Sequence, residues 1–94
     1  MSNKILVVED NPDIALQVQR FLEANGFATH HIVKGDEVVE YVRENKPDLI
    51  IMDLVIPGKD GLQCCGEIRE FSNIPIIMLT GKSEEVDRLS LIHI

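Results

Sequence analysis

Short apolar segments alternate along the chain with longer segments in which apolar residues recur every three or four positions. The short segments are rich in Val, Ile and Leu, which is typical of strands that are covered on both faces. The longer segments have the spacing of amphipathic helices. The pattern predicts strands at residues 5–8, 27–33, 49–52 and 74–79, and helices after them at residues 12–25, 35–46, 61–71 and from about 83.

Local signals mark where these helices begin and end. Asn11 and Pro12 are a favoured N-cap and first helical residue, and Gly26 is favoured just after a helix end. Lys46 precedes Pro47, and a residue in that place disfavours helical backbone. The alternation of strands and helices predicts an α/β fold, a doubly wound parallel sheet with right-handed crossovers, in one domain of 94 residues.

Helical spacing also predicts which side chains enter the core. The predicted positions are Ile14, Val18, Phe21, Leu22, Val38, Val39, Val42, Leu62, Cys65 and Ile68. Cys64 and Cys65 point about 100° apart on a helix, and a disulfide between adjacent cysteines would be strained. We interpret both as reduced thiols that are wholly or partly buried.

Charge and composition exclude several classes of protein. The net charge of −7 and pI near 4.8 disfavour nucleic-acid binding by this chain, because phosphate neutralisation requires clustered Lys and Arg. No apolar run approaches the ~20 residues of a membrane helix, and the N-terminus lacks the apolar region of a signal peptide. We therefore expect a cytoplasmic protein with no membrane contact.

Chemistry-bearing residues follow three of the predicted strands. Glu9 and Asp10 follow the first strand, Asp53 the third and Thr80 the fourth. In a doubly wound sheet the ligand site lies outside the carboxyl ends of the strands, so these residues are expected to converge. Each alone has a simpler interpretation as a capping, turn or solvated residue. In combination they predict a Mg²⁺ site prepared for a phosphoryl group, with an Asp as nucleophile and Thr80 as hydrogen-bond donor.

Three segments carry a family resemblance: ILVVED at residues 5–10, PDLIIMDLVIPGKDG at 47–61 and PIIMLT at 75–80. They resemble the receiver domain of two-component response regulators, in the subfamily with a winged-helix DNA-binding domain downstream. The resemblance covers residues 3 to about 89. It implies the flavodoxin-like receiver fold with strand order 2-1-3-4, and a switch that controls transcription in the intact protein.

The resemblance also implies a role for each site residue. Asp53 is the phosphoacceptor for a sensor histidine kinase. Asp10 and Asp53 bind Mg²⁺, Glu9 binds it mainly through water, and the carbonyl of Val55 supplies a further ligand. Thr80 is the switch hydroxyl that moves to the phosphoryl group. Such a domain is not an enzyme, and it catalyses at most its own phosphorylation and dephosphorylation.

The sequence departs from the family pattern near its C-terminus. The family's Lys at the end of a fifth strand, that strand and the fifth helix are missing, and Lys82 lies too near Thr80 to replace the Lys. We assign residues 1–89 to a partial receiver domain and residues 90–94 to an atypical tail that need not be native. The fourth strand is then expected to form a bare, apolar sheet edge and to promote self-association in a marginally stable chain.

Three alternatives to the phosphoacceptor switch can be compared with the sequence, which weakens the first, rejects the second and leaves the third open. A Mg²⁺-dependent phosphohydrolase of the haloacid dehalogenase type has a second acid two residues after its nucleophile, where this chain has Val55. A dinucleotide-binding module requires a Gly-rich turn where this chain has acidic residues. An inert fragment or interaction module keeps the site without being phosphorylated. His30 and His31 are interpreted as surface residues of an edge strand whose side chains point to opposite faces.

Overall fold

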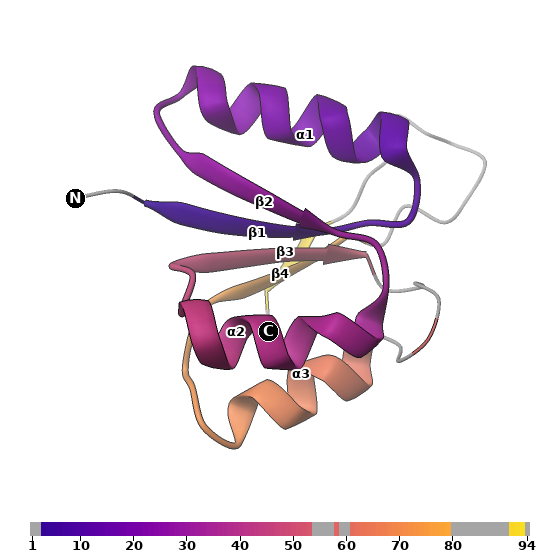
Figure 1. Cartoon of the computed structure of the whole chain (residues 1–94), viewed down its shortest axis with the longest axis vertical. Coiled ribbons are helices and arrows are strands. Elements are labelled where there is room, and N and C mark those ends of the chain that lie inside the picture. The colour runs from indigo at the N-terminus through magenta and orange to yellow at the C-terminus, as the bar shows by residue number, and fades with distance from the viewer. Residues whose placement is uncertain (1–2, 54–57, 59–60, 80–90, 94) are drawn as a thin grey trace.

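The structure is a computed structural model that describes residues 3–53, 58, 61–79 and 91–93 (Figure 1). The predicted helix from about residue 83 lies outside these residues. The described elements alternate as the sequence predicts. They are β1 (Lys4–Val8), α1 (Pro12–Ala24), β2 (Ala28–Ile32), the 3₁₀ turn η1 (Gly35–Glu37), α2 (Val38–Asn45), β3 (Leu49–Asp53), α3 (Gly61–Arg69), β4 (Ile76–Leu79) and β5 (Leu91–His93).

The strands form one sheet in the order β2-β1-β3-β4-β5. β2, β1, β3 and β4 are mutually parallel, which confirms the predicted order 2-1-3-4. Figure 1 shows α1 on one face of this sheet and α2 and α3 together on the other. Helices on both faces explain why the inner strands are apolar at consecutive positions.

The predicted helix boundaries follow from local chemistry. The side-chain Oδ1 of Asn11 accepts hydrogen bonds from the backbone N–H groups of Asp13 (2.9 Å) and Ile14 (3.3 Å), so it caps α1. Gly26 follows the end of the same helix with φ of 92°. This backbone angle causes little steric strain in glycine, because glycine has no Cβ. Lys46 ends α2 in the left-handed region, directly before Pro47.

Gly58 occupies the turn after β3 with φ of 81°. A Cβ at this position would lie 2.8 Å from Oδ1 of Asp36, closer than real Cβ atoms come to other atoms. Glycine is therefore favoured here by the backbone angle, and any larger residue would also require the side chain of Asp36 to shift.

The prediction that β4 forms a bare sheet edge is wrong. β5 pairs with β4 in antiparallel orientation, and Met78 lies opposite Ile92. The unpaired N–H and C=O groups of a strand edge accept any extended segment that can reach them, and a short apolar stretch of the tail does so. The antiparallel direction distinguishes β5 from the parallel fifth strand that the family resemblance implies. Self-association through β4 remains a prediction, but it now requires β5 to be displaced.

The core is divided by the sheet into two unequal parts. On the face covered by α2 and α3, the α2/α3 face, the buried cluster is Leu6, Val8, Ile32, Val38, Val39, Val42, Ile50, Met52, Cys64, Cys65, Ile68, Ile74, Ile76 and Met78. On the opposite face, the α1 face, the buried cluster of the described residues is Ile5, Val7, Ala15 and Leu22. Adjacent strand residues therefore serve different faces.

Two predicted core positions are wrong. Phe21 is 69% exposed and Leu62 is 59% exposed. Both have helical spacing from core residues, but they lie at the margin of the apolar stripe, where the helix has turned away from the sheet. On α3, Cys64 is fully buried and Cys65 is 5% exposed, so the two cysteines contribute to the core.

Candidate functional site

Two carboxylates of the site continue the alternation of the α1 face. Val7 pairs with Ile51 across β1 and β3, and both side chains pack on the α1 side of the sheet. Glu9 follows Val7 by two residues and Asp53 follows Ile51 by two. Because side chains two residues apart on a strand share a face, the apolar rows of the α1 face end in adjacent acids.

The structure brings Glu9, Asp10 and Asp53 together, as the sequence predicts. Each offers one carboxylate oxygen, and these oxygens all lie within 4.8 Å of one another. Glu9 is buried with 3% exposure, Asp53 is half-buried and Asp10 is exposed. The cluster is thus anchored in the protein on one side and open to water on the other.

The buried member of the cluster is held by the backbone of the next turn. The N–H of Asn11 donates a hydrogen bond of 3.2 Å to Oε2 of Glu9. Because the side chain of Asn11 caps α1, this residue contacts the helix start through its side chain and the acidic cluster through its backbone. The N-terminus of α1 is therefore attached to the site.

The pKa of Glu9 is raised from 4.5 to about 7, chiefly because its carboxyl group is buried. The hydrogen bond from Asn11 N–H opposes this shift, while the negative charge of Asp53 and hydrogen bonds with the side chains of Asp10 and Asp53 contribute to it. Carboxylates that crowd together resist ionisation unless a cation joins them. A cation bound among these carboxylates would favour the ionised form of Glu9 and lower its pKa.

The donor set fits a hard divalent ion. Mg²⁺ prefers carboxylate and water oxygens as ligands. Three carboxylate oxygens within 4.8 Å of one another would hold such an ion either directly or through water molecules. The exposure of Asp10 leaves room for the water and phosphoryl oxygens that Mg²⁺ keeps in its shell.

Two predicted site residues, Val55 and Thr80, lie outside the described residues. β3 ends at Asp53 and β4 at Leu79, and these two residues are paired across the sheet. The roles assigned to the carbonyl of Val55 and to the hydroxyl of Thr80 therefore stay predictions.

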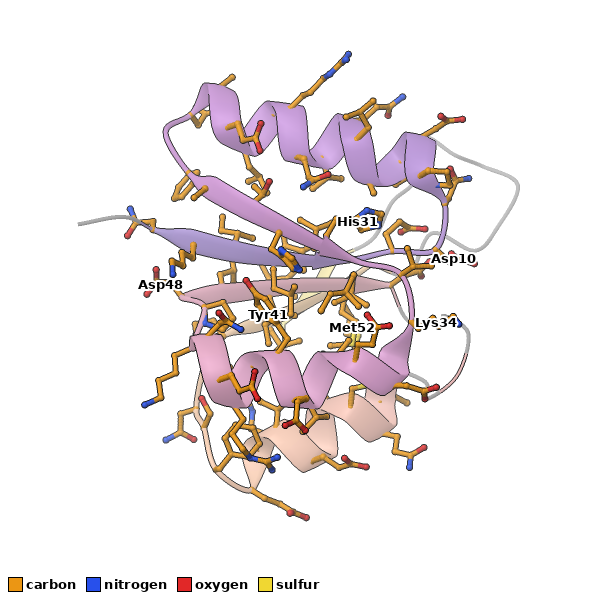
Figure 2. The ribbon with its side chains drawn as sticks, in the orientation of Figure 1. Asp10, His31, Lys34, Tyr41, Asp48 and Met52 are labelled. Atoms are coloured by element: carbon orange, nitrogen blue, oxygen red, sulfur yellow. The ribbon has the colours of Figure 1, made fainter. Side chains whose placement is uncertain are left out.

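His31 is a site neighbour that sequence reasoning missed. Its Nε2 lies 2.7 Å from the backbone carbonyl oxygen of Glu9. Figure 2 shows the imidazole on the α1 side of the sheet, toward the end at which Asp10 lies. His30 faces the other way and stacks on Tyr41 of α2, with ring centroids 4.4 Å apart. The opposite orientation of the two histidines was predicted, but not the contact of His31 with Glu9.

The pairing register contains the signal that would have found this contact. His31 pairs with Val7, two residues before Glu9, so the two strands end together at the site. The sequence predicts the alternation of β2 but not its register against β1. Without the register, the distance from His31 to the Glu9 carbonyl is unknown.

A family model decides the classification. The model of the response regulator receiver domain matches residues 5–94, almost the whole chain. The chain belongs to the response regulator receiver domain family. This family is a switch domain in general and not an enzyme.

Relatives with known names agree with the receiver classification. The transcriptional regulatory protein BaeR of Escherichia coli O6:H1 is 51% identical over 86 residues, which are 92% of this chain and 36% of BaeR. The DNA-binding response regulator MtrA of Mycolicibacterium smegmatis is 41% identical over 87 residues, 93% of this chain and 38% of MtrA. The chain thus spans little more than a third of these curated relatives.

Solved receiver structures have the same fold. The BeF₃-activated N-terminal receiver domain of Klebsiella pneumoniae RstA superposes with a TM-score of 0.81 at 32% identity, over 90% of this chain and 73% of that chain. The receiver domain of the sensor histidine kinase PA1611 of Pseudomonas aeruginosa, which has magnesium coordinated in its active site cleft, has a TM-score of 0.82 at 32% identity, over 94% of this chain and 75% of that chain.

Within the described part of this receiver, no helix is long and apolar enough to cross a membrane.

Proposed function

We propose that this receiver is a phosphoacceptor switch in which Asp53 takes a phosphoryl group from a phosphohistidine of a sensor histidine kinase. The observation that carries the proposal is the cluster of Glu9, Asp10 and Asp53, whose oxygens lie within 4.8 Å of one another. Asp53 is half-buried, so its carboxylate can meet a donor that approaches from solvent. An Asp carboxylate is a competent nucleophile for phosphoryl transfer.

The reaction follows from the placement of these groups. An oxygen of Asp53 forms a bond to phosphorus while the N–P bond of the phosphohistidine breaks, and the imidazole leaves with the electron pair of that bond. Asp10, Asp53 and the carbonyl of Val55 would hold Mg²⁺, with Glu9 bound to it mainly through water, and the ion would neutralise charge on the transferred group. Thr80 donates a hydrogen bond to a phosphoryl oxygen and reports the new state.

The switch acts once on its own side chain and does not turn over an external substrate. We infer that small phosphoryl donors also react with Asp53, and that the acyl phosphate is later hydrolysed at the same site. The phosphohydrolase alternative is disfavoured because its second acid would occupy position 55, which is Val. The inert-fragment alternative differs from the switch in predicting no phosphorylation of Asp53.

We also propose a regulatory output for the longer protein. BaeR is named a transcriptional regulatory protein and MtrA a DNA-binding response regulator, and each is much longer than the part matched here. A net charge of −7 opposes DNA binding by this chain itself. The DNA-binding domain is therefore expected outside these 94 residues, in a protein of the cytoplasm.

Acetyl phosphate with Mg²⁺ tests the phosphoacceptor function. Intact-mass measurement of the folded protein should show a gain of one phosphoryl group that requires Mg²⁺ and is abolished in Asp53→Asn. The matched control is Asp13→Asn, which changes an exposed acid in the first turn of α1 and should leave the gain intact. A folded sample that gains no mass would support the inert-fragment alternative.

A further inference from the structure

We propose that His31 is a positioning residue of the acidic cluster. By donating a hydrogen bond from Nε2 to the backbone carbonyl of Glu9, it fixes the peptide unit between Glu9 and Asp10, and so sets the affinity of the site for Mg²⁺. The inference rests on the proposed function, because it concerns the same Mg²⁺ site. It assigns a role to a residue of β2, a strand that contributes no carboxylate to the cluster.

The end of the β1–β2 ladder shows why the imidazole matters. The N–H of Glu9 donates a hydrogen bond to the carbonyl of Ile32 at 3.1 Å, just beyond the end of β1. β2 ends at Ile32, and the carbonyl of Glu9 accepts from His31 at 2.7 Å. The two contacts hold the backbone of Glu9 on both sides at the point where the chain leaves the sheet.

The chemistry of the contact fixes the tautomer of His31. A backbone carbonyl only accepts hydrogen bonds, so Nε2 must carry the proton. A carbonyl oxygen and an imidazole N–H at 2.7 Å make a short, well-formed hydrogen bond. His31 is half-buried, so fewer water molecules compete for this carbonyl than at an exposed turn.

The peptide that His31 holds joins two members of the cluster. Glu9 and Asp10 are adjacent, and their carboxylates project from consecutive residues toward Asp53. A rotation of this peptide would move both carboxylates relative to Asp53. Groups that orient metal ligands by hydrogen bonding change metal affinity by about 10- to 100-fold when they are removed.

Four substitutions separate positioning from general stability. His31→Gln keeps an amide N–H at the distance of Nε2 from the backbone, and His31→Leu keeps similar bulk without a donor. His31→Asn keeps a donor that is too short to reach the carbonyl of Glu9. His30→Gln is the matched control, because His30 is the next residue of the same strand, is exposed and contacts Tyr41 on the other face.

The test is the Kd for Mg²⁺, measured by isothermal titration calorimetry on the folded variants. All variants are measured in the same buffer. His31→Leu and His31→Asn should bind Mg²⁺ about tenfold more weakly. His31→Gln should remain within about threefold of the wild type, and His30→Gln should match it. Circular dichroism establishes that each variant is folded.

The outcomes distinguish this inference from the proposed function. A wild type that binds no Mg²⁺ would overturn the proposed function and the role of His31 with it. A wild type that binds Mg²⁺ with the same Kd as His31→Asn and His31→Leu would overturn the role of His31 alone. Loss of affinity in His31→Gln equal to that in His31→Asn would also overturn it, because the donor would then be irrelevant.

Discussion

The two faces of the sheet differ in function, because one contains most of the core and the other ends in the acidic site. The α2/α3 face contains most of the buried apolar side chains, gathered from β1, β2, β3, β4 and two helices. The α1 face has a small buried cluster and partly exposed neighbours such as Leu49 and Ile51. The same α1 face ends in Glu9, Asp53 and the imidazole of His31. Most of the buried apolar side chains that stabilise the fold lie on the α2/α3 face, and the acidic cluster lies at the end of the α1 face.

Strand geometry makes this division sharp. Met52 is fully buried on the α2/α3 face, and the next residue, Asp53, belongs to the acidic cluster. Two consecutive residues of β3 therefore belong to the core and to the site, respectively. An unsatisfied charge is costly inside a large apolar core, whereas a thin and partly hydrated face tolerates one more easily.

The largest expected effect is on the free energy of unfolding, when neighbouring residues of β3 on the two faces are replaced. Ile50→Ala should lower the free energy of unfolding by about 4 kcal/mol, because its side chain is fully buried on the α2/α3 face. Ile51→Ala should cost about 2 kcal/mol or less, because Ile51 is only partly buried. Urea unfolding followed by circular dichroism measures both. Equal losses would contradict the division of the core.

The next effect concerns the pH dependence of the ion-free protein. The pKa of Glu9 is about 7 in the folded protein and 4.5 as its ordinary value. Between these values the folded state binds more protons than the unfolded state, so stability falls as pH rises. The fall attributable to Glu9 is at most about 3 kcal/mol between pH ~5 and ~8.

Urea unfolding in EDTA across this pH range measures the effect, with Glu9→Gln as the comparison. Gln at position 9 does not titrate and can still accept the hydrogen bond from Asn11 N–H. Its stability curve should therefore be flatter than that of the wild type by the contribution of Glu9. Parallel curves would show that Glu9 does not carry a raised pKa.

The smallest effect tests a residue that contacts both the helix and the site. Asn11→Ala removes the side chain that caps α1 and should cost about 1 kcal/mol. The backbone N–H that holds Glu9 remains, so the Kd for Mg²⁺ should change by less than about threefold. Asn45→Ala, at the exposed end of α2, is the control and should cost less. A large loss of Mg²⁺ affinity in Asn11→Ala would show that the cap and the site are coupled.

The sequence predicted most of the fold because its signals are local. Asn11 and Pro12 mark a helix start by their own chemistry, and an apolar run that stops at Asp53 marks the end of a covered strand. The convergence of Glu9, Asp10 and Asp53 follows from a general property of parallel sheets, and the structure brings the three together.

The errors concern relations between elements. Helical spacing shows that Phe21 and Leu62 belong near an apolar stripe, but not how far each helix is rotated against the sheet. The antiparallel pairing of β5 depends on which segment reaches an open edge, and a three-residue strand has little sequence signal. The contact of His31 with Glu9 depends on strand register. None of these relations is encoded in a single segment.

The most direct test of the division between the faces is urea unfolding with and without Mg²⁺ for wild type, Ile50→Val and Asp53→Asn. Mg²⁺ at about one hundred times its Kd should stabilise the wild type by about 2.7 kcal/mol. Ile50→Val should lose about 1 kcal/mol in both conditions and keep that increment. Asp53→Asn should be at least as stable as the wild type without the ion and should lose the increment. An increment that survives in Asp53→Asn, or that disappears in Ile50→Val, would contradict the account.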